Sequence, residues 1–322
     1  MARPYDSAAD VRPESRLPPS LESAWSSPAR GLPEPALSSP RCISCGSAHA
    51  APFLEAAPYS IMQCAGCTLR FLWPQPGSDE QTTLYSEQYF HSAEGLDQGY
   101  AEYVSQADNH RATFRDRLRL LPAPSGEARL LDVGAAAGFF VEQATAAGWR
   151  AEGIELSRWA TEYAANVVGV PVREGTLRDA AFADRSFDAV TMWEVIEHLP
   201  DPRAELAEVR RILRPGGMLH FSTPDAGSMV AKLSGRRWLG WRKIPEHLFY
   251  FDLASLRRLL SDEGFEIVSH RYVSLTVTWE YALRRLGALL GTRAFERVPR
   301  VIGERSVRIN CYYDLMVSAR VL

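Results

Sequence analysis

The sequence predicts an α/β protein built on a doubly wound parallel sheet, with a small cysteine-rich domain in front of it. Three observations lead to this prediction. From Gly126 onward, short apolar runs typical of buried strands alternate with amphipathic runs typical of helices. A turn of small residues, Gly134 to Gly138, joins the first of these strands to the first of these helices. Ahead of this region stand two closely spaced C-x-x-C pairs.

The bulk composition sets limits on the function. A chain of 322 residues is long enough for one large domain and a small one. Its net charge of -3 argues against a strong non-specific nucleic-acid binder. No apolar run approaches the ~18 residues of a membrane span, and the N-terminus lacks the apolar core of a secretion signal. We therefore expect a cytoplasmic protein.

Four segments are predicted along the chain. Residues 1–40 are rich in Pro, Ser, Ala and Arg and cannot bury enough surface to offset their ordering entropy, so we expect a disordered tail. We assign 41–90 to a zinc-binding domain and 91–125 to a helical cap, because Tyr100 to Leu121 reads as a helix. The α/β domain then covers 126–322.

The cysteine pattern indicates a metal site. The two C-x-x-C pairs are separated by eighteen residues, a spacing that suits tetrahedral Zn²⁺ bound by four thiolates. Disulfides would need an oxidising compartment, and a thioredoxin-like redox pair would not occur in duplicate. We therefore predict a structural, zinc-ribbon-like site formed by Cys42, Cys45, Cys64 and Cys67.

The start of the α/β domain has the form of a nucleotide-binding βαβ unit. A strand ending at Val133, the small-residue turn, a helix from Phe140 and a second strand ending at Glu155 follow in order. The turn lets backbone N–H groups approach a ligand, and Glu155 can accept both ribose hydroxyls. A dinucleotide fingerprint would need glycine at position 139, where Phe139 stands. Alanine at position 136 fits the turn if its φ is negative.

Further predicted strands end at the same edge of the sheet, where ligands would bind. Phe187–Trp193 and Met218–Ser222 read as the fourth and fifth strands, and ligands collect at the carboxyl ends of such strands. Beyond them, Trp279–Phe295 reads as an amphipathic helix that could form a lid, a dimer face or a membrane-surface contact. Val307–Val321 is expected to close the sheet as an antiparallel edge hairpin with the preceding strand.

Several motifs together resemble a known family. Asp132, Gly134 and Gly138 match a D-x-G-x-G-x-G loop, with Ala136 in place of the middle glycine. F-D-A-V-T-M-W-E-V-I-E-H-L-P-D-P, R-I-L-R-P-G-G-M-L and S-T-P-D follow in the order of class I S-adenosylmethionine-dependent methyltransferases. This resemblance implies a Rossmann-like fold. The cysteine-rich front also resembles that of sugar C-methyltransferases.

The resemblance implies two groups of cofactor contacts. The methionine end of S-adenosylmethionine would be held by Asp132, Gly134 and Gly138, with Trp193 beside it. The nucleoside would be held by Glu155 at the ribose, by Leu156 against the adenine, and by Thr176 and Leu177 at the adenine edge.

Four titratable residues are candidates for the chemistry. Glu194, Glu197 and His198 stand at i, i+3 and i+4, which would place them on one helical face, and His247 follows the fifth strand. Either histidine could act as a general base, or all four could ligate a divalent metal. The E-V-I-E-H element is similar to one in small-RNA 2′-O-methyltransferases and ubiquinone-pathway O-methyltransferases, where a metal is used. A purely structural role for Glu197 and His198 at the start of a helix is the third reading.

The expected activity is methyl transfer to oxygen or carbon of a small molecule, such as a nucleotide sugar or a secondary metabolite. The basic and aromatic residues between 232 and 243 could clamp a phosphate of such an acceptor or simply form a solvated loop. Two alternatives stay open. One is metal-assisted methylation of a nucleic-acid end, and the other is a non-catalytic module that binds the cofactor.

Overall fold

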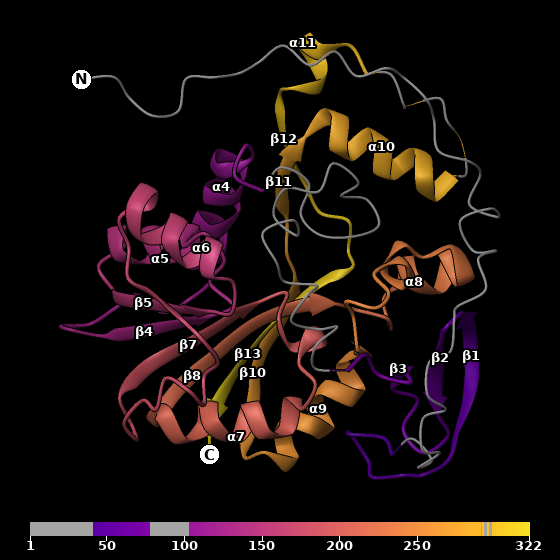
Figure 1. Cartoon of the computed structure of the whole chain (residues 1–322), viewed down its shortest axis with the longest axis horizontal. Helices are drawn as coiled ribbons and strands as arrows, with labels where there is room; N and C mark the ends of the chain where they lie inside the picture. The colour runs from indigo at the N-terminus through magenta and orange to yellow at the C-terminus, as the bar shows by residue number, and fades with distance from the viewer. Residues whose placement is uncertain (1–40, 78–102, 291, 293–294, 296–297) are drawn as a thin grey trace. The chain divides into compact units, whose positions relative to one another are not determined.

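A computed structural model describes residues 41–77, 103–290, 292, 295 and 298–322 (Figure 1). The predicted tail, residues 1–40, lies outside the described residues. So do residues 78–102, which contain the predicted boundary between the zinc-binding domain and the helical cap.

A seven-stranded sheet forms the centre of the α/β domain, and its strand order is β10-β13-β8-β7-β4-β5-β6. β6, β5, β4, β7 and β8 are parallel, whereas β13 runs antiparallel between β8 and β10. The predicted Rossmann-like class is confirmed, and β10 and β13 form the predicted antiparallel hairpin at the edge of the sheet, with β10 outermost. The strands are β4 (Arg129–Val133), β5 (Arg150–Glu155), β6 (Val172–Glu174), β7 (Phe187–Trp193), β8 (Leu213–Pro224), β10 (Phe265–Tyr272) and β13 (Asp314–Val321).

Helices cover both faces of this sheet (Figure 1). Successive side chains of a strand point to opposite faces, so Leu130 of β4 enters one core while Leu131 and Val133 enter the other. One face is covered by α4 (Ala107–Leu118), α5 (Phe139–Ala146) and α6 (Arg158–Tyr163), and the other by α7 (Pro202–Ile212) and α9 (Leu253–Asp262). Continuous apolar strands such as β7 are therefore buried on both sides.

The cysteine-rich region is joined to the α/β domain by a shared sheet. Its strands β1 (Ala50–Ala56), β2 (Tyr59–Cys64) and β3 (Arg70–Trp73) are completed by β9 (Phe249–Tyr250), which comes from far along the chain. Arg203 of α7 also donates hydrogen bonds to the carbonyl oxygens of Ile43 and Ser44. The front region is thus fixed against the segment that carries His247.

An insertion between β10 and β13 stands at the carboxyl edge of the sheet, because β10 ends and β13 begins there. It contains β11 (Leu275–Thr278), α10 (Trp279–Leu290), α11 (Arg300–Gly303) and β12 (Ser306–Ile309). The β11–β12 ribbon is fixed to α4: the Thr276 N–H donates to Thr113 Oγ1 at 2.8 Å, and Ser306 Oγ donates to Asn109 Oδ1 at 2.5 Å. Among the described residues, none of the helices combines the length and the apolar character needed to cross a membrane.

Candidate active site

The small-residue turn after β4 needs glycine at both ends. Gly134 and Gly138 have φ angles of 71° and 79°, in the left-handed region that glycine adopts at no steric cost. A Cβ atom at Gly134 would lie 2.5 Å from Cγ2 of Val195, and one at Gly138 would lie 2.6 Å from Cγ2 of Val170. Both positions therefore require glycine, for the backbone conformation and for the packing.

Glu155, at the end of β5, holds the middle of this turn. Its Oε2 accepts a hydrogen bond of 3.0 Å from the N–H of Ala136, and its Oε1 accepts one of 2.9 Å from the N–H of Ser157. Burial raises the pKa of Glu155, and the backbone N–H donors oppose that shift. The φ of Ala136 is 46°, so the condition under which alanine would fit the turn without strain, a negative φ, is not met; its bond to Glu155 stabilises that backbone conformation.

The residues predicted at the adenine lie in different environments. Leu156 is 54% exposed beside Glu155, as an apolar contact surface requires. Thr176 is exposed, whereas the side chain of Leu177 is buried in the core, which leaves only its main chain for a ligand. Thr176 donates from its N–H and its hydroxyl to Oδ2 of Asp179, at 3.2 and 2.7 Å. Asp179 is thus an acid at this edge that the sequence analysis missed.

The predicted methionine end is lined by buried polar groups. Oδ1 of Asp132 accepts a 2.6 Å hydrogen bond from Thr191, and burial raises the pKa of Asp132 to about 8. Tyr103 was not predicted as a site residue. Burial raises the pKa of its phenol, and the charges of Asp132 and Glu155 add to the shift. Its ring packs with Ala137 of the turn and lies 5.6 Å, centre to centre, from the ring of Phe139, which directly follows the turn.

A second group of buried polar side chains, linked by hydrogen bonds and an ion pair, lies beside Trp193. The guanidinium carbon of Arg117 lies 5.0 Å from the centre of the Trp193 ring, and its Nη2 pairs with Oδ2 of Asp314 at 2.7 Å. Arg117 also donates to Ser222 Oγ, which in turn donates to Oε1 of Glu194 at 2.7 Å. Burial raises the pKa of Glu194 well above its ordinary value, and the charges of Asp314 and Glu197 add to the shift.

The predicted helical face that joins Glu194 to Glu197 and His198 is wrong. Only Ile196–His198 form a short 3₁₀ helix, η2, and Glu194 precedes it with a φ of 56°. This turn sends Glu194 toward Ser222, while Glu197 and His198 meet His247 from the loop before β9. One ligand atom from each of Glu197, His198 and His247 lies within 4.8 Å of the others. The backbone N–H of Leu248 donates to the carbonyl of Glu197 at 2.8 Å and holds the two segments together.

The electrostatics of this trio, Glu197, His198 and His247, are set by burial. Neither carboxylate oxygen of Glu197 accepts a hydrogen bond of good geometry among the described residues. Burial raises its pKa to about 8, although its own N–H and the Thr223 hydroxyl lie near enough to oppose that shift. Burial lowers the pKa of His198 to about 4, and that of His247 well below its ordinary value. Nδ1 of His198 lies 2.9 Å from the carbonyl oxygen of Glu246, which can only accept, so Nδ1 carries the hydrogen. The trio can therefore accept a proton or bind a divalent cation.

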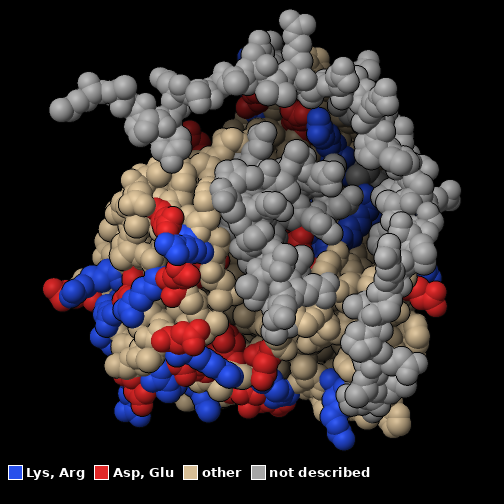
Figure 2. All heavy atoms as spheres, in the orientation of Figure 1, with Lys and Arg blue, Asp and Glu red and all other residues tan. Residues whose placement is uncertain are grey.

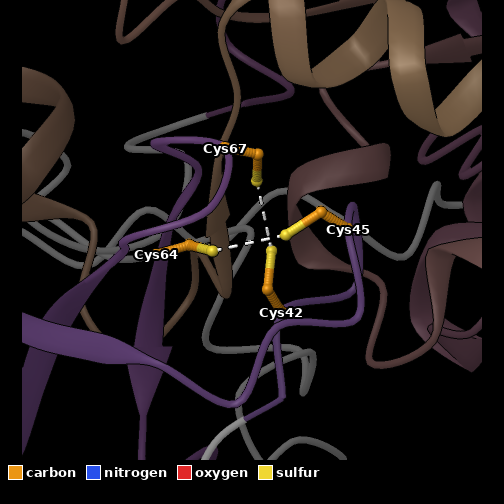
Figure 3. Close-up of side chains that lie close together, drawn as sticks. All are labelled: Cys42, Cys45, Cys64 and Cys67. Atoms are coloured by element: carbon orange, nitrogen blue, oxygen red, sulfur yellow. Dashed lines mark hydrogen bonds between the residues drawn. The ribbon is translucent and has the colours of Figure 1, made fainter.

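The four cysteines of the front region converge on one point (Figure 3). The Sγ atoms of Cys42 and Cys67 are 3.4 Å apart, as are those of Cys45 and Cys64, and all four thiols are free. Burial raises the pKa of Cys64, but the N–H of Gly66 and the neighbouring thiols outweigh it, and the pKa falls to about 7. Four sulfurs at this spacing match the donor set of tetrahedral Zn²⁺.

The sheet and the turn closed by Glu155 define an α/β enzyme that binds a nucleoside-containing cofactor at the carboxyl edge of its strands. The family model described as Methyltransferase domain matches residues 103–270, and the chain belongs to this family. The protein is an S-adenosylmethionine-dependent methyltransferase of class I, as the motifs predicted.

Known proteins similar to this chain agree with that assignment. It is 37% identical over 107 residues to the ubiquinone biosynthesis O-methyltransferase of Ralstonia nicotianae, covering 31% of this chain and 45% of that protein. The corresponding protein of Thiobacillus denitrificans is 30% identical over 156 residues, covering 45% of this chain and 67% of the relative. The chain thus spans about half the length of the first of these curated relatives.

Two solved structures show the same fold. One is in the complex between the Haloferax volcanii Trm112 methyltransferase activator and a methyltransferase, with a TM-score of 0.51 and 19% identity; the match covers 73% of this chain and 97% of that one. The other is the cyclase SpnF, with a TM-score of 0.50 and 19% identity, covering 77% and 98%.

Proposed function

We propose that this methyltransferase acts on an oxygen or carbon atom of a small-molecule acceptor that binds beside Glu197, His198 and His247. The observation that carries the proposal is the convergence of these three buried or half-buried side chains from two distant segments, with neither oxygen of the Glu197 carboxylate in a hydrogen bond of good geometry among the described residues. The names of the curated relatives, O-methyltransferases of ubiquinone biosynthesis, support oxygen as the methylated atom.

The cofactor lies across the turn from Gly134 to Gly138 in this proposal. Each oxygen of Glu155 accepts one backbone hydrogen bond and keeps a lone pair for a ribose hydroxyl. Leu156 packs on the adenine, and Asp179 stands with Thr176 at the adenine edge. Asp132 and Trp193 face the methionine end, under Tyr103. The two glycines keep the turn in this conformation, since a Cβ atom at either position would meet a neighbouring side chain of the protein.

His198 is the proposed proton acceptor. S-adenosylmethionine supplies an electrophilic methyl group on a sulfonium, which the acceptor takes by in-line displacement. The carbonyl of Glu246 fixes the hydrogen of the neutral His198 ring on Nδ1, so the lone pair is on Nε2, the atom that would take the proton of the acceptor hydroxyl. The ring stays neutral near pH 7 because its pKa is lowered to about 4. Glu197 lies close enough for a carboxyl oxygen to accept a hydrogen bond from the imidazolium once it forms.

A divalent cation held by the same trio is the second candidate mechanism. One carboxylate and two imidazoles form a suitable donor set, and the bond from His198 to a backbone carbonyl is the usual support of a metal-bound histidine. When bound, the cation would lower the pKa of an acceptor hydroxyl and orient a diol. Glu194 is not part of this ligand set, because its carboxylate is held by Ser222.

We also propose that the four cysteine thiolates hold a structural Zn²⁺. Such an ion would fix the turns that precede β1 and follow β2, and through β9 it would steady the segment that carries His247.

The test is transfer of labelled methyl from S-adenosylmethionine to a panel of catechols, nucleotide sugars and RNA, with and without a chelator. We expect label in a small molecule and none in RNA. Label in RNA alone would refute the small-molecule proposal. Unchanged activity after complete chelation, with one zinc retained, would exclude the second mechanism.

A further inference from the structure

Trp241 of the α/β domain contacts the cysteine-rich region. It belongs to a short 3₁₀ helix, η4 (Leu239–Arg242), in the segment between β8 and β9. Its ring centre lies 5.2 Å from that of Phe53 in β1, and the guanidinium carbon of Arg70 in β3 lies 5.4 Å from it. Its Nε1 donates to the carbonyl oxygen of Gly235 at 3.0 Å, which orients the indole. The indole is therefore held by residues of both regions.

Trp241 also contacts the strand that begins just after His247. Its ring centre lies 5.0 Å from that of Tyr250 in β9, and the Tyr250 ring lies 6.1 Å from that of His247. The rings of His247 and His198 meet edge to face, with their centres 4.7 Å apart. Aromatic rings attract one another at separations of roughly 4.5–7 Å. A continuous series of packed rings therefore leads from the cysteine-rich region to the trio.

The rings in this series are enclosed by the protein. Figure 2 shows Lys, Arg, Asp and Glu side chains over much of the surface, whereas Trp241, Tyr250 and His247 are only 4%, 3% and 7% exposed. Protein interiors are packed as densely as organic crystals, so a change in one buried ring is felt by the next. The position of the Tyr250 ring thus depends on the indole beside it.

The orientation of the His247 ring is set by this packing. The backbone of its segment is fixed, because the Leu72 N–H in β3 donates to the carbonyl of Leu248 at 2.8 Å. Such bonds leave the side-chain torsions of His247 undetermined. Among the described residues, no hydrogen bond to its ring nitrogens determines them either. The ring of Tyr250 is therefore a main constraint on where the imidazole points.

We propose that Trp241 is a positioning residue for methyl transfer: it holds Tyr250 against His247 and so keeps the His247 ring in the trio. The inference rests on the proposed function, since that proposal places the acceptor beside the trio. It also gives the cysteine-rich region a part in the reaction, because side chains of β1 and β3 hold the indole. Trp241 itself contacts neither the cofactor nor the acceptor in this account.

The test variant is Trp241→Leu, which keeps an apolar side chain but removes the ring. The ring signals of His247 are followed by NMR in protein carrying isotope-labelled histidine, with chelator present, and are identified by their loss in His247→Gln. We expect these signals to shift in Trp241→Leu and kcat to fall about tenfold or more, because a displaced catalytic group is costly. The KM for S-adenosylmethionine should stay unchanged. Trp241→Phe, which keeps a ring beside Tyr250, should restore most of both properties.

Trp149→Leu is the matched control for the loss of a buried indole. Trp149 is 8% exposed and packs in the core on the other face of the sheet, just before β5. This variant should lose stability and keep both kcat and the His247 signals. A fall in kcat as large as that of Trp241→Leu would show that lost stability alone explains the effect, which would overturn the proposal.

Two further outcomes would overturn it: unchanged His247 signals in folded Trp241→Leu, or shifted signals with the kcat of wild type. If Trp241→Leu does not fold, Phe53→Leu decides by the same two measurements, since it removes the ring that supports the indole from β1. Failure of the proposed function has a separate signature. His247→Gln and His198→Ala would then both keep the kcat of wild type, while the NMR signals would still report whether Trp241 positions His247.

Discussion

Oε2 of Glu155 lies 3.0 Å from the amide nitrogen of Ala136, nineteen residues earlier in the chain. This bond joins the end of β5 to the turn after β4, and it occurs at a non-glycine residue with positive φ. The carboxylate therefore has two roles in our account. It stabilises the turn, and it presents its remaining lone pairs to the ribose of the cofactor.

Adding one methyl group at Gly138 should lower the stability of the fold strongly. Gly138→Ala should be destabilised by more than the ~1–2 kcal/mol cost of a left-handed alanine, because its Cβ would lie 2.6 Å from Cγ2 of Val170. Gly216 has a similar φ of 77°, and a Cβ atom there would have no neighbour within 4 Å among the described residues, so Gly216→Ala isolates the conformational cost. Urea unfolding of both variants measures the difference. Equal losses would contradict the packing argument.

Zinc content should depend on the four clustered cysteines alone. We expect one zinc per chain in the wild-type protein and none in Cys64→Ala, with a lower melting temperature, because three thiolates hold the ion poorly. Cys311 is exposed and lies outside the cluster, so Cys311→Ala is the control that keeps its zinc. Elemental analysis of the purified proteins checks this, and zinc retained by Cys64→Ala would refute the site.

Glu197 predicts a pH dependence of stability when the trio holds no metal. Its pKa is raised to about 8 in the folded protein, from an unfolded value of about 4.3. The unfolded state thus releases this proton first, and the stability of the fold falls as pH rises between these two values. The side chain of Glu197→Gln does not titrate in this range. Its melting temperature, measured with chelator present, should therefore rise relative to wild type from pH 5 to pH 8. A constant difference across that range would show that Glu197 is ionised in the fold.

His198→Ala should lower kcat by about a hundredfold or more, as loss of a general base does, while affinity for S-adenosylhomocysteine is kept. The proposed contacts of the cofactor come from other residues, so binding and chemistry should separate. His270, on the edge strand β10, supplies the control variant His270→Ala. Steady-state kinetics and calorimetry on the three proteins check this. Equal kcat in His198→Ala and wild type would remove His198 from the mechanism.

Local sequence patterns predicted the parts of the site that depend on neighbouring residues. The alternation of strands and helices predicted the sheet, and the position of Glu155 at the end of a strand predicted its place beside the turn. The burial of Leu177 was not predictable, because one exposed and one buried residue stand side by side after β6. The positive φ of Glu194 has no signal in the sequence either, yet it separates that residue from Glu197.

The long-range contacts could not be predicted from the sequence either. The pair Arg117–Asp314 joins α4 to β13, and His247 reaches His198 through a loop before β9. Such pairs are set by strand order, which hydrophobic periodicity does not encode. The E-V-I-E-H element indicated that chemistry occurs there, but only the structure shows which three of the four predicted residues meet.

The central claim is that Glu155 binds the ribose of the cofactor, and calorimetric titration with S-adenosylhomocysteine tests it most directly. Glu155→Ala removes the two charge-assisted hydrogen bonds proposed between this carboxylate and the ribose hydroxyls. Binding of S-adenosylhomocysteine should therefore weaken by about tenfold or more. Glu152→Gln, in the same strand but paired with Arg129 and Arg173, is the control and should bind as wild type does. Equal affinity of wild type and folded Glu155→Ala would contradict the account.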